Sequence, residues 1–269
     1  MVNSKVEEVM FESLSGLLGY RSMIRSLVRR EIRGRYKGSI LGFLWNFITP
    51  LIQILVYMMV FTVIFKSGLE NYAIYLVAGL VPWIYYSDSV SEGSGTLVAN
   101  GDMMKKIYFP RSVLPISTVL AKLVNMLLTM IVMFVIIGAS GFGVNFTALL
   151  FLIPAIIIYT IFLIGLTCML SAINVYLRDV QYIVTVLLMA HIWLTPIMYV
   201  RTNFDNELIN TILAYNPMTY FIGLFQDILY WKQVPDPLTW GICLLCAATI
   251  TVVGAIVFKK LENDFAEVL

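Results

Sequence analysis

The sequence predicts an all-α membrane protein with six transmembrane helices, and three observations support this fold class. Hydrophobic residues make up 60% of the chain, charged residues make up 13%, and the mean hydropathy is +0.87, whereas about a quarter of a soluble domain is charged. Six apolar stretches are each long enough to cross about 30 Å of hydrocarbon as a helix. Basic residues lie almost entirely on one side of the membrane that these stretches would cross. The stretches run over residues 40–65, 72–90, 113–138, 148–173, 182–199 and 238–258.

The distribution of lysine and arginine predicts that both termini are cytoplasmic, because positive residues in short loops resist translocation. The segments before the first stretch, between the second and third, between the fourth and fifth, and after the sixth hold fourteen basic residues, namely Lys5, Arg21, Arg25, Arg29, Arg30, Arg33, Arg35, Lys37, Lys105, Lys106, Arg111, Arg178, Lys259 and Lys260. The opposite segments hold three, namely Lys66, Arg201 and Lys232. The net charge of +2 therefore reflects membrane topology and not nucleic-acid binding.

The chain divides into a cytoplasmic amphipathic segment over residues 1–38, a six-span domain over 39–260 and a cytoplasmic tail over 261–269. In the first segment, apolar side chains recur every four residues from Tyr20 to Tyr36, with arginines beside them. Such a helix is expected to lie in the membrane interface, where its arginines meet anionic lipid or an acidic partner. A simple lipid anchor that sets the topology is the alternative. The arginines assigned to this interface helix are Arg25, Arg29, Arg30, Arg33 and Arg35.

A more polar region between the second and third stretches predicts one short cytoplasmic helix over residues 97–108, which a proline ends before the third stretch. Methionine, isoleucine, tyrosine and phenylalanine stand there among basic residues. So many apolar groups on a cytoplasmic face indicate a docking surface. The residues expected to act in this surface are Asn100, Gly101, Met103, Lys105, Lys106, Tyr108 and Arg111.

Two half-length helices are predicted between the fifth and sixth stretches, over residues 206–215 and 217–231. Asn216 is expected to cap the second helix, and Pro217 to occupy its first turn, where the missing amide hydrogen costs nothing. Because neither helix is long enough to cross the bilayer, the pair fits a re-entrant hairpin on the outer side. A loop that rests on the membrane surface is the alternative.

Catalytic chemistry is sparse in this sequence, which predicts no enzyme site and no metal site. No GxxxxGK[ST] motif occurs, so any ATP used in transport must bind to another subunit. His191, the one histidine, and the three cysteines are interpreted as helix-packing residues. Lys122 and Asp88 are expected to reach toward a membrane interface. So few charges within the spans argue against an ion-coupled carrier.

Aromatic side chains are dense in the predicted spans, and two interpretations apply to them. Many would form the belts of tryptophan and tyrosine found at membrane interfaces. Aromatic faces also contact the apolar faces of sugar rings, while hydroxyl and indole NH groups bond their edges, so a sugar conduit could be lined in this way. The residues assigned to such a channel are Trp45, Tyr57, Phe61, Trp83, Tyr85, Trp193 and Tyr199.

Five strings of residues carry a resemblance to a known family. They are RREIRGRYKGSILGFLWNFITP from Arg29, YLVAGLVPW from Tyr75, NGDMMKKIYFPRSVLP from Asn100, VYLRDV from Val175 and YNPMTYF from Tyr215. In order, spacing and topology, the chain resembles the membrane subunits of ABC exporters for bacterial polysaccharides over nearly its whole length.

The resemblance implies a function and a set of partners. Such proteins form a homodimer, pair with two copies of a separate ATPase that binds ATP and magnesium, and export undecaprenyl-pyrophosphate-linked O-antigen, capsule or teichoic acid through the bacterial inner membrane. It implies that the 97–108 segment is the coupling helix, and that spans one and five form the dimer seam. Asn216, Pro217, Phe221 and Phe225 would belong to an outer gate. The alternatives are an ABC permease for a lipid or drug, and a membrane enzyme that acts on lipid-linked sugars.

Overall fold

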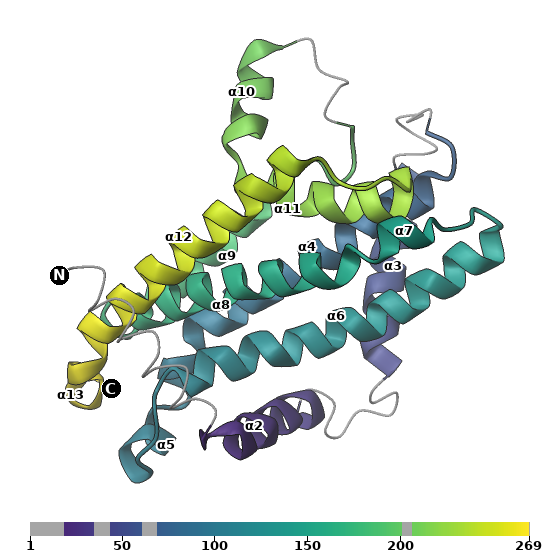
Figure 1. Ribbon diagram of the computed structural model, residues 1–269. Coiled ribbons are helices and arrows are strands. Elements are labelled where there is room, and N and C mark those ends of the chain that lie inside the picture. The colour runs from purple at the N-terminus through teal and green to yellow at the C-terminus, as the bar shows by residue number, and fades with distance from the viewer. Residues whose placement is uncertain (1–18, 35–43, 61–68, 201–205, 269) are drawn as a thin grey trace.

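The computed structural model describes residues 19–34, 44–60, 69–200 and 206–268, and all regular structure in this part of the chain is helical (Figure 1). The α-helices are α2 (Arg21–Gly34), α3 (Trp45–Met59), α4 (Tyr72–Ala99), α5 (Gly101–Lys106), α6 (Val113–Ser140), α7 (Phe146–Leu149), α8 (Leu152–Tyr176), α9 (Val180–His191), α10 (Glu207–Tyr215), α11 (Pro217–Gln226), α12 (Pro237–Leu261) and α13 (Phe265–Val268). A π-helical turn, η4 (Asp227–Trp231), extends α11, and a 3-10 turn, η5 (Glu262–Asp264), follows α12. The all-helical fold that the sequence predicts is confirmed for these residues.

Among the residues that the structure describes, three helical segments are long and apolar enough to cross a membrane, by length and composition: Val113–Ser140, Phe146–Tyr176 and Pro237–Asp264. Their outward faces carry large exposed apolar side chains, for example Ile131, Ile157 and Leu245, which are 60%, 53% and 69% exposed. Water would not tolerate so much contiguous apolar surface on a monomeric protein. The chain is therefore a multi-pass membrane protein.

Helix α4 lies at the centre of the helical assembly and packs against α3, α6, α8, α9 and α11. Buried side chains face in every direction around it from Tyr72 to Leu97. Because its neighbours replace lipid on most sides, α4 accommodates tyrosines, serines and a proline that a lipid-facing helix would disfavour. Pro82 lies inside this helix, and its carbonyl oxygen accepts a hydrogen bond from the hydroxyl of Tyr159 on α8, at 3.0 Å.

Helices α8 and α12 approach each other closely through glycine. A Cβ atom added at Gly254 would lie 2.2 Å from the carbonyl oxygen of Gly165, and one added at Gly165 would lie 2.6 Å from Cα of Thr251. The absence of side chains lets the two backbones meet, as is usual where membrane helices pack tightly. The cysteines Cys168 and Cys243, also on these helices, are buried as well.

Two predicted boundaries are wrong. The fifth stretch does not form one helix over residues 182–199, because α9 has 12 residues and ends at His191. At about 1.5 Å per residue it is roughly 18 Å long, which is too short to cross the hydrocarbon. The helix predicted over 97–108 is also not continuous, since α4 extends to Ala99 and the separate α5 has six residues. The ends of the first predicted span lie outside the described residues.

Helices α2, α5 and α13 lie at one end of the molecule (Figure 1). The main core of buried side chains surrounds α4, and a second, smaller cluster closes this end. Leu27 of α2, Leu97 of α4 and Phe265 of α13 meet in it. The tail therefore does not simply extend from the last helix. It folds back so that Phe265 is fully buried against Phe258, while the hydroxyl of Tyr176 donates to the carbonyl oxygen of Leu261 at 2.9 Å.

Candidate functional site

Helix α2, which the sequence predicts to be an interface helix, lies against α6 and exposes its basic side. Leu27 is its buried residue and packs in the second cluster with Ile24 partly buried beside it. The arginines Arg25, Arg29 and Arg33 are exposed, whereas Arg35 lies outside the described residues. The four-residue apolar repeat therefore identified the correct side of the helix, but its most buried residue, Leu27, stands outside that repeat.

The predicted docking segment is interrupted at Asn100, between α4 and α5, and the side chain of Asn100 is bonded there by Arg30 of α2. The side-chain nitrogen Nδ2 of Asn100 donates to the carbonyl oxygen of Thr96 at 2.8 Å, and Oδ1 of the same side chain accepts from Arg30 Nη2 at 2.7 Å. Arg30 Nη1 also lies 3.9 Å from Sδ of Met103. The interface helix and α5 are thus tied together at the first turn of α5.

The segment after α5 presents an exposed apolar edge. Tyr108 is 98% exposed and Ile107 is 56% exposed, while Lys105 and Lys106 project into solvent beside them. A cavity of about 390 Å³ opens next to this edge. Its lining residues come from two distant parts of the sequence and are Met104, Ile107, Tyr108, Phe109, Pro110, Arg111, Glu262 and Asn263.

The tail supports this edge through Arg111. The guanidinium of Arg111 lies 5.7 Å from the ring centroid of Phe265, a cation–π contact. Arg111 and Glu262 both line the neighbouring cavity, so this guanidinium and this carboxyl stand in the same wall. Sequence reasoning treated residues 261–269 as a plain tail and missed this contribution to the exposed edge at Tyr108.

Lys122, which the sequence predicts to reach toward a membrane interface, is buried between α2, α4 and α6. Its side chain is 1% exposed and lies between two carboxylates: Nζ donates to Oε2 of Glu92 on α4 and lies 3.4 Å from Oε1 of Glu31 on α2. A buried ammonium is costly unless it is paired, and here two other helices supply the pairing. The pKa of Glu31 is raised above its usual value, chiefly because the carboxyl is buried. The charge of Lys122 opposes this effect, and the charge of Glu92 adds to it.

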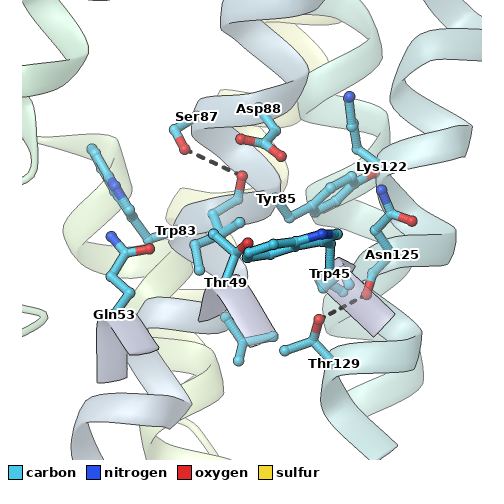
Figure 2. A pocket seen from close by; sticks show the side chains of 13 residues that line it. Trp45, Thr49, Gln53, Trp83, Tyr85, Ser87, Asp88, Lys122, Asn125 and Thr129 are labelled. Carbon is cyan, nitrogen blue, oxygen red and sulfur yellow. Dashed lines mark hydrogen bonds between the residues drawn. The ribbon is translucent and has the colours of Figure 1, made fainter. Parts of the chain in front are cut away.

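A polar cavity of about 420 Å³ lies between α3, α4 and α6 (Figure 2). Two indoles, those of Trp45 and Trp83, stand in its wall beside amide, hydroxyl and carboxylate groups. The Oδ1 atom of Asn125 is buried and has no hydrogen-bond partner in the described part of the chain. The lining residues are Trp45, Thr49, Gln53, Val81, Trp83, Ile84, Tyr85, Ser87, Asp88, Lys122, Asn125, Met126 and Thr129. The cavity wall therefore combines aromatic rings with hydrogen-bonding groups.

Only part of the predicted channel set meets at this cavity. Trp45, Trp83 and Tyr85 line it, although Tyr85 is nearly buried and its hydroxyl donates to Thr160 on α8 at 3.2 Å. Tyr57 packs against the main core without lining the cavity. Trp193 and Tyr199 lie on the turns after α9, where the Tyr199 hydroxyl donates to the Trp193 carbonyl oxygen at 2.8 Å. Phe61 lies outside the described residues.

The polar residues of the cavity were missed although a signal was present. Trp45, Thr49 and Gln53 recur every four residues in a mostly apolar stretch, and Asn125 and Thr129 do the same. Residues four apart share one face of a helix. Each set therefore predicts one polar stripe, but the contact between the two stripes depends on how the helices pack.

At the end of the molecule away from α2, α5 and α13, α10 and α11 form the two short helices that the sequence predicts (Figure 1). Each of them begins with an asparagine cap. Asn206 Oδ1 accepts from the amide of Leu208 at 3.0 Å, and Asn216 Oδ1 accepts from the amide of Met218 at 2.9 Å. Pro217 occupies the first turn of α11, as expected. These local caps explain why the boundaries of the outer helices could be predicted.

Asn216 also joins the outer helices to α9. Its Oδ1 lies 3.0 Å from Nε2 of His191, and since that oxygen is an acceptor, the His191 proton belongs on Nε2. Nδ1 of His191 then accepts from the Tyr86 hydroxyl of α4 at 3.2 Å. The amide nitrogen of Asn216 donates to the carbonyl oxygen of Leu194 at 2.9 Å and lies 3.1 Å from Oγ1 of Thr195. The interpretation of His191 as a hydrogen-bonded packing residue is confirmed.

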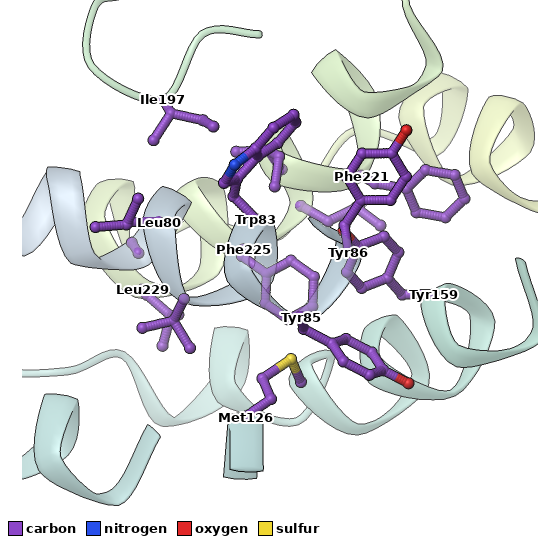
Figure 3. Close-up of a cluster of buried hydrophobic side chains, with 14 of the residues drawn as sticks. Leu80, Trp83, Tyr85, Tyr86, Met126, Tyr159, Ile197, Phe221, Phe225 and Leu229 are labelled. Atoms are coloured by element: carbon purple, nitrogen blue, oxygen red, sulfur yellow. The ribbon is translucent and has the colours of Figure 1, made fainter. Parts of the chain in front are cut away.

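The two phenylalanines assigned to an outer gate lie inside the helical assembly (Figure 3). Phe221 and Phe225 are fully buried. The ring of Phe221 lies 4.7 Å from that of Phe162 and 5.1 Å from that of Tyr159, both on α8. In this arrangement they anchor α11 to the membrane helices.

Comparison with known proteins agrees with this architecture. The model of the ABC-2 type transporter family matches residues 23–230. The O-antigen export system permease protein RfbA of Myxococcus xanthus is 35% identical over 205 residues, which cover 75% of this chain and 78% of that protein. Two proteins of the same name from Klebsiella pneumoniae are 30% and 31% identical over 202 residues, covering 75% of this chain and 77% of each relative. The chain is a member of the ABC-2 type transporter family.

Proposed function

We propose that this chain is the membrane subunit of an ATP-driven exporter that moves undecaprenyl-linked polysaccharide, specifically O-antigen, across the bacterial inner membrane. The observation that carries the proposal is a polar, indole-lined cavity among membrane helices, joined through Lys122 to the cytoplasmic helix α2. The names of the relatives, which are O-antigen export permeases, support the choice of substrate. Teichoic acid, capsule, lipid and drug remain the competing substrates.

Membership of an ABC transporter family implies an ATPase partner. We assign two ATPase copies to the complex, with ATP and magnesium bound on them, and we assign their docking surface to α5 and the exposed edge at Tyr108. Exposed apolar residues beside basic ones, at the end of the molecule where α2 and α13 also gather, support this assignment. An aromatic side chain that is 98% exposed fits a pocket on a partner.

A second copy of the chain would complete the transport path. Apolar side chains project from the described faces of α3 and α9 and from the turn that follows α9, where two protomers would meet in a homodimer. They include Ile52, Val56, Met59, Val186, Leu187 and Trp193. In this arrangement α3, α4 and the short α9 with its following turns supplement the three apolar spans to give six membrane-embedded segments, with both termini in the cytoplasm. The α10–α11 hairpin would then flank the exit as an outer gate.

Deletion of the gene tests the proposed function directly. We expect the deletion strain to lose its surface polysaccharide and to accumulate lipid-linked polymer on the cytoplasmic side, because synthesis continues when export stops. Surface labelling and fractionation of lipid-linked glycans would measure both quantities, and the wild-type gene should restore export. An unchanged surface polysaccharide together with a changed lipid or drug profile would contradict O-antigen export and favour the other substrates.

The docking assignment predicts that Tyr108→Asp separates the ATPase from the membrane subunit. A charge placed in an apolar contact should weaken association by about 2 kcal/mol or more, which is roughly thirtyfold. Because Tyr108 is 98% exposed, folding should not change. Co-purification of the ATPase measures the effect. Tyr215→Asp is the matched control, since Tyr215 is 85% exposed at the other end of the molecule; equal retention of the ATPase by both variants would refute the assignment.

A further inference from the structure

We propose that Glu31, Lys122 and Glu92 form an electrostatic link that transmits movement from the cytoplasmic helix α2 to the wall of the polar cavity. Lys122 and Glu31 act here as positioning residues and do not contact the ATPase. The inference rests on the proposed export function, which it extends by naming the path of coupling within the protomer. The link joins three helices that are distant in sequence, namely α2, α4 and α6.

The cytoplasmic end of this link lies in two adjacent residues of α2. Arg30 donates to the side chain of Asn100 at 2.7 Å, immediately before α5, while Glu31 lies 3.4 Å from the ammonium of Lys122 on α6. Successive residues of an α-helix point about 100° apart, so the two side chains hold different neighbours. Helix α2 is therefore tied both to the proposed docking helix and to a membrane-embedded charge.

The other end of the link lies in the cavity wall. Lys122 itself lines the cavity, and so does Asn125 one turn further along α6. On α4, Asp88 lines the cavity one turn before Glu92. Figure 2 shows Asp88, Lys122 and Asn125 around the same space. A displacement of Lys122 or Glu92 must consequently alter the lining of the cavity.

Because Lys122 is buried, a movement of α2 must be passed on through its ion pairs. The Lys122 side chain is 1% exposed, whereas those of Glu31 and Glu92 are 29% and 46% exposed. The lysine cannot exchange its carboxylates for water as an exposed ion pair would. When α2 moves, Lys122 must either follow Glu31 or remain with Glu92 alone. A movement of α2 thus shifts α6 relative to α4 if Lys122 follows Glu31, and leaves α6 in place if Lys122 stays with Glu92.

Glu31→Gln separates coupling from folding. It removes the charge that α2 contributes and leaves the Lys122–Glu92 pair intact, so the protein should still reach the membrane and bind its ATPase. In the complex with its ATPase, we expect polymer exported per ATP hydrolysed to fall about tenfold, within the range that allosteric coupling spans. Glu70→Gln removes the same charge from an exposed side chain before α4 and serves as the control.

Charge exchange tests whether the link is electrostatic. Glu31→Lys leaves two lysines and one glutamate in the cluster, and Lys122→Glu leaves three glutamates. The double variant E31K/K122E restores two acids and one base, with the base now on α2. We expect the double variant to recover at least about a third of the wild-type export per ATP, well above either single variant.

The outcomes separate this inference from the proposed function. If the wild-type complex exports no polysaccharide, the proposed function is wrong. If the wild type exports but Glu31→Gln keeps the wild-type ratio of export to hydrolysis, the link does not transmit movement. The same conclusion follows if Glu31→Gln no longer binds the ATPase subunit, because Glu31 would then serve assembly of the complex. Failure of the double variant to improve on Glu31→Lys would likewise overturn the electrostatic assignment.

Discussion

Gly254→Ala is expected to prevent stable packing of the two most closely apposed membrane helices. The added methyl would lie 2.2 Å from the carbonyl oxygen and 2.9 Å from the carbonyl carbon of Gly165 on α8. Both are backbone atoms, so no flexible side chain can move aside. Overpacking typically costs 1–3 kcal/mol, and with backbone on both sides we expect about 3 kcal/mol, which would lower the apparent melting temperature by roughly 10 °C.

Gly241→Ala provides the control within the same helix. A Cβ atom at Gly241 meets nothing within 4 Å, so this variant changes only the intrinsic preference for helix, which favours alanine by about 1 kcal/mol. Thermal unfolding of the purified protein in detergent would compare the two variants. If Gly254→Ala and Gly241→Ala melted at the same temperature, α8 and α12 would not pack as closely as the structure shows.

The parts of the fold that could be predicted are those with local causes. The third span was expected over residues 113–138 and is observed as Val113–Ser140, because a proline-containing start and a following Gly141 define it. Helix α12 begins with Pro237 in its first turn. Runs of apolar residues and caps are visible in sequence without knowledge of what the helix contacts.

The early end of α9 had a local signal that was overlooked. Pro196 disfavours helical geometry in the residue before it, Thr195. The carbonyl groups that follow have no partner within a helix and are bonded by distant side chains instead: Gln226 donates to the carbonyl oxygen of Pro196 at 3.0 Å, and Tyr72 to that of Met198 at 2.8 Å. Hydropathy alone treats residues 182–199 as one span, since it does not register where backbone hydrogen bonds are made.

The candidate site could be predicted only in part, because its polar groups depend on pairing between helices. Arg30, Glu31 and Lys122 appear in sequence as surface charges and as an interfacial lysine. Their partners, Asn100 and Glu92, lie 70 and 30 residues away respectively. No periodicity within one helix indicates such contacts, whereas the stripe of Trp45, Thr49 and Gln53 was readable from spacing alone.

Asn216→Ala is expected to loosen the outer helices from α9. One side chain here serves His191, the Leu194 carbonyl oxygen, the Thr195 hydroxyl and the first turn of α11. Removing the Asn216 side chain leaves several of these groups without a partner. Water cannot easily replace it, because Asn216 is only 9% exposed. An unsatisfied buried group costs about 1–3 kcal/mol, and because such losses are not additive we expect a total of about 3 kcal/mol. Hydrogen exchange in α10 and α11 should increase with the loss of stability.

Asn206→Ala is the matched comparison, because Asn206 begins α10 through the same kind of cap but is exposed and bonds two backbone amides. Loss of a cap alone costs about 1 kcal/mol. The difference of about 2 kcal/mol between the two variants would measure what Asn216 adds through His191 and the turns after α9. Equal destabilisation would mean that Asn216 acts only as a cap, and that the outer helices are held to the membrane helices by Phe221 and Phe225 instead.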